Sequence, residues 1–403
     1  MMHVLCIVRT LPLPGSGDRK EGVYPVMLRA HVRAGFRTAL AVQAADPQED
    51  LTRFCDDQNM QLVCKRRCAA ITLLQYLLVR CTWGWASFVW RNRTLLAGID
   101  RYVADHGRPD LVVGLQACAS AGRVAYLVGR RHSIPFASRE NTTWFTRDLV
   151  VGRLRSTLRD VVGAASKVLT LSPQLADNME RALGMAIPHK VTMPNPVANE
   201  MFEPPETSEW VDQFARSRFI FAGWTNWRDI KRVDIAIDAF AMVHAEFPDT
   251  CLIVAGPVPS HLQQAIDARG LGGAVLLAGS LNRVGIRQLA HRSDCCIVPS
   301  DHDPGNNSVL EAMAAGTPAV VTRCGGAECR ITAPWLGRIS EPGDAELFSA
   351  AMRDMFVHRE SFERERIADE CRRLYSEGAF ARRLLAIYGA VEQDSDSSPG
   401  VAA

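Results

Sequence analysis

The chain has 403 residues, of which 47% are hydrophobic and 22% are charged, and its net charge is only +2. This length exceeds one ordinary domain and predicts two, and the composition excludes a disordered chain because it supplies enough apolar residues for a core. No stretch of about 18 apolar residues is free of charge, so a membrane-spanning helix is not expected.

Predicted strands and helices alternate along the whole chain. The strands are expected at 3–9, 38–44, 110–115, 135–140, 167–171, 219–224, 251–256, 274–279, 295–300 and 318–323. Nearly all are continuously apolar, as is typical of strands buried on both faces of a parallel sheet. Amphipathic segments such as 230–247 fall between them and give repeated βα units. The sequence therefore predicts an α/β fold with two doubly wound, Rossmann-like domains.

The domain boundaries follow from a proline-rich segment at 193–206. We expect an N-terminal domain over 1–197 and a C-terminal domain over 198–375. A helix at 376–392 is expected to pack back on the N-terminal domain, and the polar segment 393–403 is expected to be a disordered tail. Because ligands bind outside the carboxyl ends of parallel strands, the predicted site is an interdomain cleft.

The charges are unevenly distributed between the two halves. Residues 1–200 carry 26 Lys and Arg against 16 Asp and Glu, whereas residues 201–403 carry 20 against 28. Such a division suggests that the two halves have different partners. The basic half is suited to anionic lipid, a phosphate-bearing acceptor or nucleic acid.

The segment 64–93 combines basic residues with tryptophans. Lys65, Arg66 and Arg67 precede a run that contains Trp83, Trp85 and Trp90. This pattern favours a helix at the interface of an anionic membrane, and the alternative is a core helix with a basic end. Nucleic acid is not expected as a partner because no nucleic-acid-binding motif accompanies the pattern.

The cysteines and the N-terminal sequence indicate in which cellular compartment the protein is expected. The 12 cysteines are scattered and form no paired CxxC motif, so a structural metal is not expected and buried thiols in a reducing cytosol are the simpler account. The first apolar run, HVLCIVR, is too short for a signal-peptide core and is predicted as a strand. We therefore expect a cytoplasmic protein, with any membrane contact peripheral and on the inner face.

Residues 301–318, DHDPGNNSVLEAMAAGTP, place two carboxylates around a loop of small residues. The loop follows a buried strand, and a helix is expected to begin near Ser308. Free N–H groups at a helix start bind phosphate, and small residues let the backbone approach it; here these are Gly305, Asn306, Asn307 and Ser308. Glu311 is placed to accept two ribose hydroxyls. The alternative is that Ser308 caps the helix with Glu311 as its capping-box partner.

A second polar loop follows the strand that ends near Gly223. Lys231 and Arg232 stand there at the start of the next helix, where cations oppose the helix dipole and need another reason to be present. Anchoring a diphosphate is one such reason, and an ordinary solvated face is the alternative.

At this point the sequence resembles a known family. PSDHDPGNNSVLEAMAAGTPAVVTRCGGAE looks like the C-terminal signature of retaining glycosyltransferases of family four, which have the two-domain GT-B fold. GWTNWRDIKRVDIAIDAF, LTLSPQLADNME and VTMPNPVANEMFEP are similar to further segments of that family. EGVYPVMLRAHVRAGFRTALAV, which contains Gly22, resembles its glycine-rich loop and first helix. The resemblance spans about residues 1–390 and implies that the domain at 1–197 binds the acceptor and the domain at 198–375 the nucleotide sugar.

The resemblance implies roles for individual residues. Glu311 would bind the nucleotide ribose, and the amides around Val309 and Leu310 would bind the diphosphate. Asp303 would contact the donor sugar, and Lys231 would neutralise the leaving phosphate. No metal is implied, so the Asp-His-Asp run at 301–303 is not expected to bind one, and no cofactor is expected beyond the nucleotide sugar.

Three positions depart from the family pattern. The first acid of the signature is Asp303, one methylene shorter than the usual Glu. The family's Gly-Arg is Gly223–Trp224, so Arg228 is the candidate to replace the missing phosphate-binding arginine. Asn141 occupies the position of a histidine near the transferred sugar, and an amide can hydrogen-bond a hydroxyl but cannot titrate.

These features predict a metal-independent, hexosyltransferase-like glycosyltransferase. It would move a sugar from a nucleotide-diphosphate sugar to a polysaccharide, glycolipid or lipid-linked acceptor, with retention. One alternative is a nucleotide-sugar epimerase of the same fold, which the sparsity of histidine in the predicted loops argues against. Another is a non-catalytic sugar- or partner-binding scaffold, suggested by Trp224 and Asn141.

Overall fold

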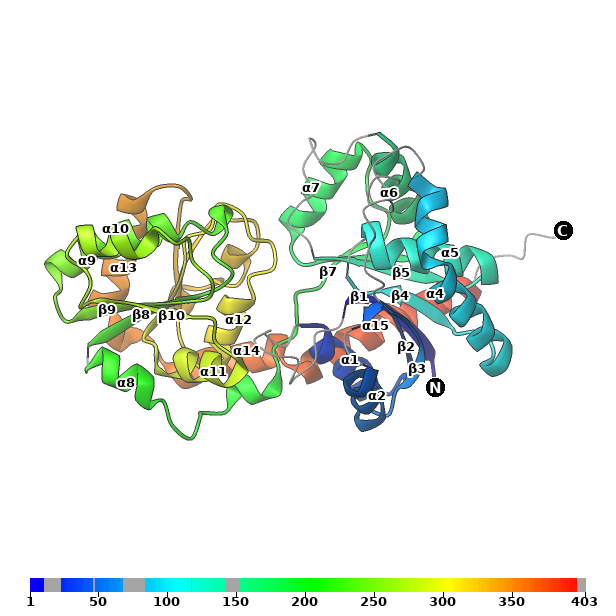
Figure 1. Cartoon of the computed structure of the whole chain (residues 1–403), viewed down its shortest axis with the longest axis horizontal. Coiled ribbons are helices and arrows are strands. Elements are labelled where there is room, and N and C mark those ends of the chain that lie inside the picture. Colours follow the sequence, from blue (N-terminus) through cyan, green and yellow to red (C-terminus); the bar gives the residue numbers. More distant parts are fainter. Residues whose placement is uncertain are drawn as a thin grey trace. The chain divides into compact units, whose positions relative to one another are not determined.

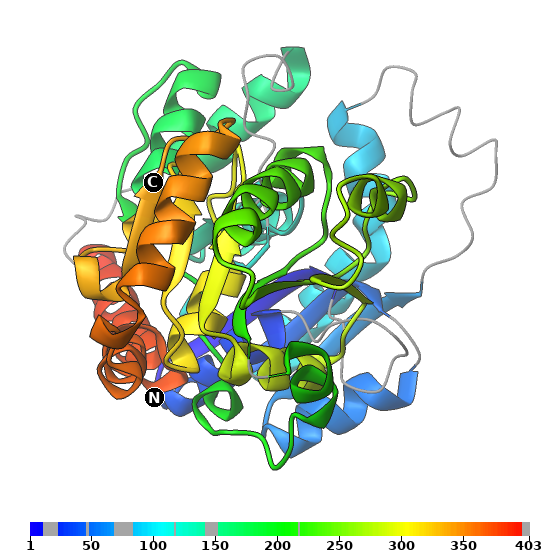
Figure 2. The same cartoon turned by 90° about the vertical axis from the view of Figure 1, so that its left-hand side faces the viewer.

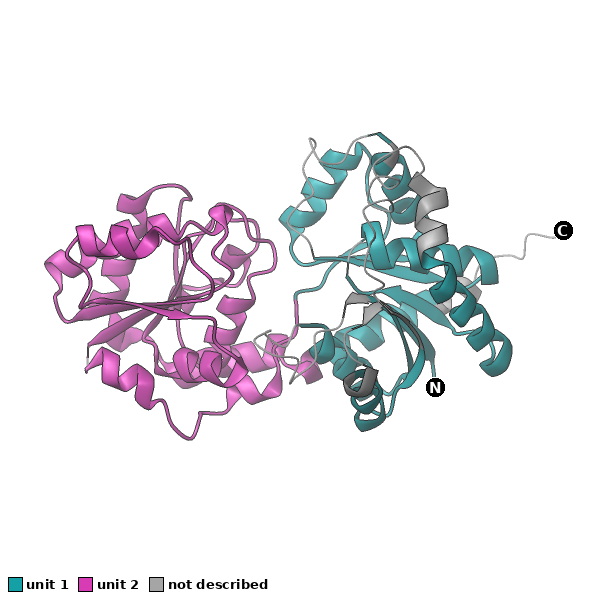
Figure 3. Ribbon diagram, in the orientation of Figure 1, with its two compact units in different colours: residues 1–16, 22–194, 380–403 teal, residues 17–21, 195–379 magenta. Residues whose placement is uncertain are grey.

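The computed structural model describes residues 1–10, 23–45, 48–67, 84–116, 118–141, 152–216 and 218–396. These residues form two compact units (Figure 3). Unit 1 contains the described residues up to Pro194 together with those from Phe380 onward, and unit 2 contains the described residues of 195–379. The chain therefore passes into unit 2 close to the predicted boundary at 197 and returns to unit 1 slightly after the predicted one at 375.

Unit 1 contains a parallel sheet with the strand order β3-β2-β1-β4-β5-β6-β7. Its strands are β1 (His3–Thr10), β2 (Arg37–Ala45), β3 (Gln61–Arg67), β4 (Leu111–Gly114), β5 (Phe136–Glu140), β6 (Lys167–Thr170) and β7 (Lys190–Thr192). Successive residues of β1 face opposite sides, with Leu5 and Ile7 in one buried cluster and Val4 and Cys6 in the other. This two-sided burial explains the continuously apolar strand sequences.

Helices cover both faces of this sheet (Figure 1). One face packs against α4 (Gly84–His106), α5 (Arg123–His132), α6 (Gly152–Ala164) and α7 (Pro173–Leu183). The other packs against α1 (Val23–Arg33), α2 (Gln48–Asp57) and α15 (Glu377–Asp396). A short π-helix, η1 (Cys118–Gly122), follows β4.

Unit 2 contains a second parallel sheet with the order β10-β9-β8-β11-β12-β13. Its strands are β8 (Phe219–Trp224), β9 (Thr250–Ala255), β10 (Val275–Gly279), β11 (Cys295–Val298), β12 (Ala319–Thr322) and β13 (Gly337–Ser340). The chain enters the sheet at β8 and crosses from the β10 edge back to β11 beside β8. The topological switch point therefore lies between β8 and β11, where ligands of such sheets bind.

The helices of unit 2 also lie on both faces of its sheet (Figures 1 and 2). One face packs against α8 (Glu209–Ala215), α11 (Arg283–Arg292), α12 (Asn307–Ala314) and α14 (Arg364–Tyr375). The other packs against α9 (Val233–Glu246), α10 (Leu262–Ala268) and α13 (Ala345–Val357). The 3-10 turns are η2 (Asn199–Phe202), η3 (Asp229–Lys231), η4 (Ala327–Cys329), η5 (Pro334–Leu336) and η6 (Arg359–Ser361).

The predicted fold class is confirmed, and all ten predicted strands are present within a residue or two of their expected ends. The prediction missed β3, β7 and β13, each of which lies at an edge of its sheet. An edge strand is covered less completely and does not need a continuous apolar run. Accordingly the sequences of the missed strands, QLVCKRR, KVT and GRIS, lack one.

The last helix packs on unit 1. Phe380, Leu384, Tyr388 and Val391 of α15 are buried in the same cluster as residues of α1 and β1. The helix continues to Asp396, whereas a tail was expected to begin at 393. The buried residues of α15 anchor it up to Val391, and neither Gly nor Pro interrupts the next turn, so the helix extends further than its polar composition suggested.

The tryptophan-rich segment 64–93 lies only partly within the described residues. Residues 68–83 lie outside them, and α4 begins at Gly84. Beyond the segment, Leu95, Leu96 and Ile99 of α4 are buried in the core of unit 1. Membrane contact by the segment therefore stays a prediction. Within the part of the chain that the structure describes, no helix is long and apolar enough to cross a membrane.

Candidate functional site

The residues predicted to bind the donor gather at the carboxyl edge of the unit 2 sheet. Lys231 follows β8, Asp303 follows β11, and the two side chains form an ion pair. Trp224 ends β8, and its indole donates a hydrogen bond to Glu311 of α12. These contacts arise because β8 and β11 are adjacent parallel strands, so the loops after them emerge side by side.

Asp303 organises the loop in which it lies. Its Oδ1 atom accepts hydrogen bonds from the backbone N–H groups of Gly305, at 3.3 Å, and Asn306, at 3.2 Å. Its Oδ2 atom pairs with Lys231, and the two side chains are only 14% and 7% exposed. Both oxygens of Asp303 thus have protein partners before any ligand binds. The predicted contact between Asp303 and a donor sugar stays a prediction.

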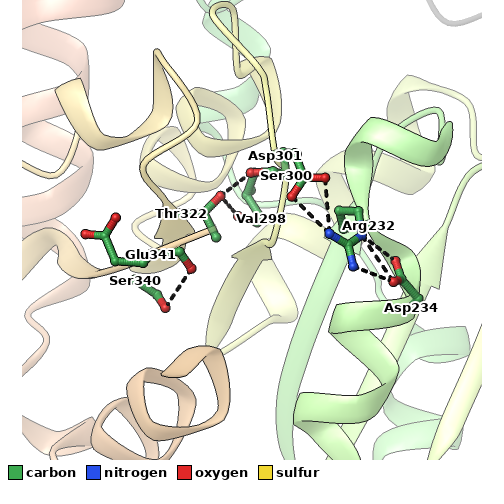
Figure 4. Close-up of polar contacts among 8 residues, drawn as sticks. All are labelled: Arg232, Asp234, Val298, Ser300, Asp301, Thr322, Ser340 and Glu341. Atoms are coloured by element: carbon green, nitrogen blue, oxygen red, sulfur yellow. Dashed lines mark hydrogen bonds and ion pairs between the residues drawn. The ribbon is translucent and has the colours of Figure 1, made fainter. Parts of the chain in front are cut away.

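The adjacent cation, Arg232, ties the same two loops together. Its guanidinium pairs with Asp234 in the first turn of α9 and with Asp301 after β11, at 2.8 and 3.1 Å (Figure 4). The hydrogen bond to Asp234 is the main reason that the pKa of Arg232 is raised. Acidic neighbours therefore compensate both cations at this helix start. These ion pairs fasten the two loops together, and the anchoring of a diphosphate by the cations stays a prediction.

Helix α12 begins differently from the capping-box alternative. Its first residue is Asn307, and the residue before it, Asn306, has left-handed backbone angles and makes no side-chain cap. Because the helix starts before Ser308 and the Glu311 carboxylate is bound to Trp224, Ser308 and Glu311 do not form the capping box.

The start of α12 also fixes which backbone groups are available to an anion. The first N–H groups of a helix have no partner within it, which here favours Asn307, Ser308 and Val309. Leu310 is the fourth helical residue, so its N–H is expected to bond within the helix. Asn195 holds the helix start by donating to the Asn307 side chain at 2.8 Å.

Two glycine positions allow close packing at this edge. A Cβ atom on Gly223 would lie 2.9 Å from the ring of Trp227, so this glycine makes room for a protein side chain. A Cβ atom on Gly326 would lie 2.4 Å from the carbonyl oxygen of Pro304. The loop after β12 therefore lies directly against the loop of Asp303.

Glu328 and His302 belong to the same cluster, and sequence reasoning missed both. The Glu328 carboxylate accepts hydrogen bonds from the backbone N–H groups of Gly325 and Gly326, each at 3.0 Å. Burial lowers the pKa of His302, and the neighbouring Asp303 carboxylate opposes that shift. His302 is adjacent to Asp303 in the signature segment quoted above, and this adjacency could have indicated that it belongs to the site.

Arg228 is exposed in the loop after β8, and its role in place of the missing family arginine stays a prediction. It precedes η3, and its carbonyl oxygen accepts from the backbone N–H of Lys231 at 2.7 Å. Among the described residues, no group of three or more His, Cys, Asp or Glu side chains could hold a metal ion.

Asn141, which was predicted to lie near the transferred sugar, is at the carboxyl edge of the unit 1 sheet. It follows β5, and its amide donates to the hydroxyl of Tyr24 at 3.1 Å. Burial raises the pKa of Tyr24 to about 12. Beneath this pair, the fully buried Arg139 donates to the carbonyl oxygen of Met193 at 2.8 Å. Gly22 lies outside the described residues.

A family model described as "Glycosyl transferases group 1" matches residues 216–357. This range holds the whole carboxyl edge of the unit 2 sheet, including Trp224, Lys231, Asp303 and Glu311. Residues 216–357 are thus similar to the glycosyl transferases group 1 family. The matched range contains every predicted donor-site residue except Gly22 and Asn141.

Two curated relatives match about half of the chain. The 2-deoxystreptamine N-acetyl-D-glucosaminyltransferase of Streptomyces fradiae is 30% identical over 254 residues, which cover 54% of this chain and 56% of the relative. Mannosylfructose-phosphate synthase of Agrobacterium fabrum is 25% identical over 237 residues, covering 55% and 52%. The chain thus spans about half the length of the curated relatives it matches.

Solved structures match nearly the whole chain, unit 1 as well as residues 216–357. A crystal structure of Anabaena HepE in complex with UDP has a TM-score of 0.72 at 15% identity, covering 96% of this chain and 100% of that one. This likeness shows the fold, which is the two-domain, Rossmann-like GT-B fold.

Proposed function

We propose that the protein is a glycosyltransferase that uses a nucleotide-diphosphate sugar and retains the anomeric configuration. The observation that carries the proposal is the convergence of two carboxylates, one buried lysine and the start of α12 at the carboxyl edge of the unit 2 sheet. The similar proteins support it, since the two curated relatives are named for sugar transfer or sugar-phosphate synthesis and the HepE structure contains UDP.

In the proposed reaction, Glu311 accepts the ribose hydroxyls and the first N–H groups of α12 bind the diphosphate. Lys231 stabilises the negative charge that develops on the diphosphate as the bond from its oxygen to the sugar C1 breaks. The acceptor oxygen forms the new bond to C1 on the same face, and its proton passes to the departing phosphate oxygen. Asp303 orders the loop and orients the sugar. No metal ion or other cofactor takes part in this proposal.

The acceptor in this proposal is a polysaccharide, glycolipid or lipid-linked saccharide bound by unit 1. Asn141 and Tyr24 present neutral hydrogen-bonding groups suited to a sugar hydroxyl. The basic segment 64–93 would bring the protein to the inner face of the cytoplasmic membrane. Sedimentation with liposomes tests this contact: binding only when anionic lipid is present supports it, and no binding to either kind of liposome contradicts it.

The donor site is tested by titrating the protein with UDP-, GDP- and ADP-sugars and following its melting temperature. We expect one nucleotide class to stabilise the wild type, because a ligand that binds the folded state raises the melting temperature. Glu311→Ala should remove this stabilisation. No stabilisation of the wild type by any of the three classes would contradict the proposed function.

Asp303→Asn is the matched variant for the transfer step. The amide oxygen can still accept from the loop, so nucleotide binding should persist, whereas the charge partner of Lys231 is lost. We expect transfer to fall roughly 100-fold, a loss of about 2.7 kcal/mol of transition-state stabilisation. Wild-type transfer by this variant would exclude the role given to Asp303, and the anomeric configuration of the product tests retention.

One observation favours a second candidate, a nucleotide-sugar epimerase. His302 lies beside Asp303 and Lys231, and an epimerase needs acid and base groups at the sugar. Incubating the donor without acceptor separates the two reactions, because only an epimerase converts the donor alone. Nucleotide binding without turnover in either assay would instead indicate a non-catalytic scaffold.

A further inference from the structure

Trp224 occupies a distinctive place at the candidate site. It is the last residue of β8, and its side chain is only 2% exposed. The strand turns this ring toward the face that carries α12, where it shares a buried cluster with Val309, Leu310 and Met313. Packing therefore fixes the position of the ring before any ligand binds.

The indole makes one directed contact from this position. Its Nε1–H group donates to the Oε2 atom of Glu311 at 2.7 Å, a short distance that is typical of a hydrogen bond to an ionised carboxylate. Glu311 is partly buried, one turn into α12. A rigid donor on one strand thus selects the orientation of a carboxylate on the neighbouring helix.

The contact uses only one of the two carboxylate oxygens. No hydrogen bond or ion pair links the other, Oε1, to any side chain in the described ranges. Once Oε2 is held by the indole, the direction in which Oε1 accepts is also determined, because the carboxylate is planar. Glu311 is therefore prepared to receive a hydroxyl in one orientation rather than in many.

We propose that Trp224 is a positioning residue that sets the selectivity of this site for a ribonucleotide over a 2′-deoxyribonucleotide. This inference rests on the proposed function, since it concerns the ribose of the same donor. The indole holds Glu311 so that the carboxylate accepts the 2′-hydroxyl of a nucleoside diphosphate. A 2′-deoxy ligand leaves that acceptor without its partner, which costs binding affinity.

The test measures dissociation constants for UDP, GDP and ADP and for their 2′-deoxy counterparts by calorimetry. We expect the wild type to prefer the ribose form of its nucleotide by roughly 10-fold or more, as for hydrogen bonds to charged groups. Trp224→Phe keeps an aromatic ring and removes the N–H donor, and it should reduce this preference at least about fivefold.

A double-mutant cycle separates positioning from general destabilisation. If Trp224 acts through Glu311, Trp224→Phe should not change the ribose preference once Glu311 is Gln. The matched control is Trp227→Phe. Trp227 lies in the loop that follows β8, and its indole is also buried, but it donates to the carbonyl oxygen of Ala255 at 3.0 Å. That control should leave the ribose preference unchanged even if stability falls.

The contact itself can be observed without a ligand. In protein labelled with ¹⁵N-tryptophan, the indole signal that disappears in Trp224→Phe should shift in Glu311→Gln. An unchanged ribose preference in Trp224→Phe, with normal nucleotide binding, would overturn the positioning role and leave the proposed function standing. If no nucleoside diphosphate binds the wild type, both fail, and an indole shift would then show only that the contact exists.

Discussion

The carboxyl edges of the two sheets are built from different chemistry. In unit 2, the loops after β8 and β11 are joined by ion pairs of Lys231 with Asp303 and of Arg232 with Asp301. In unit 1, the corresponding edge presents the neutral pair of Asn141 and Tyr24, above a buried arginine that contacts a backbone carbonyl. Ion pairs between side chains therefore join two loops at the unit 2 edge. At the unit 1 edge, the neutral contact of Asn141 with Tyr24 stands beside the buried Glu140, whose carboxylate accepts from the backbone N–H of Cys118.

The largest test of this contrast is Lys231→Met. It leaves Asp303 largely buried without its cation, and breaking such a pair costs about 3 kcal/mol of unfolding free energy. Transfer should also be lost, because no other group in the proposal neutralises the leaving phosphate. Urea denaturation and initial-rate assays measure the two effects.

The control for that variant is Lys190→Met in unit 1. Lys190 pairs with Glu180 at 2.8 Å, but its side chain is 42% exposed. Exposed ion pairs contribute little, so stability should barely change. Equal losses of unfolding free energy in the two lysine variants would contradict the expectation that the buried ion pair of unit 2 contributes more to stability than the exposed pair of unit 1.

Acidification should lower the unfolding free energy of unit 1 by protonating His31. Its Nδ1–H donates to the carbonyl oxygen of Met27 at 2.7 Å, and its Nε2 accepts from the hydroxyl of Tyr388 at 3.2 Å. Burial, reinforced by Arg139, lowers the pKa of His31 from 6.5 to about 4, against the opposing Met27 carbonyl. The unfolded chain therefore binds the proton more readily. The contribution of neutral His31 to the unfolding free energy is fully present above pH 6.5 and is lost as the pH falls toward 4.

Between pH 7 and pH 5 this group should lower the unfolding free energy by about 2 kcal/mol. Urea denaturation at both pH values measures the loss, and hydrogen exchange of the β1 amides assigns it to unit 1. His31→Gln should show a smaller decrease than the wild type. His358→Gln, which alters an exposed histidine of unit 2, should behave as the wild type does. Identical pH dependence in His31→Gln and the wild type would exclude this origin.

The smallest expected effect is that of Tyr24→Phe, which removes the partner of the Asn141 amide. We expect the KM for the acceptor to rise roughly 10-fold, about 1.4 kcal/mol, with nucleotide affinity unchanged. Tyr126→Phe is the control, because it removes a tyrosine hydroxyl of unit 1 that accepts from the exposed Arg130 rather than from Asn141. A change in nucleotide affinity with no change in the KM would reverse the assignment of the two edges.

Much of this architecture could be predicted from apolar runs, because strands buried on both faces must be apolar throughout. The same argument explains the omissions, since β3, β7 and β13 are edge strands. Asp303, Lys231 and Glu311 were found because their residue types and spacing indicate a ligand at a helix start. Their present partners depend on contacts between loops, which local sequence does not specify.

Trp224 shows this difference most clearly. In the sequence it stands as the loss of an arginine, and in the structure it is the donor that holds Glu311. The helix start was predicted to within one residue, but its capping was not, because α12 begins at Asn307 after the left-handed Asn306 and without a side-chain cap. Neither the hydrogen bond between Trp224 and Glu311 nor the uncapped start of α12 follows from residue type alone. Each depends on the position of neighbouring strands and loops in the fold.

The packing of α15 has a consequence for synthesis of the protein. Unit 2 is translated before Phe380, whereas the core around Met27 and Leu28 of unit 1 is closed by Phe380, Leu384 and Tyr388. During synthesis, unit 1 is therefore begun first, but its core is completed only after unit 2 has been translated. Its unclosed apolar face must be kept from aggregation while unit 2 emerges and folds. For the same reason, residues 1–194 alone lack a part of their own core.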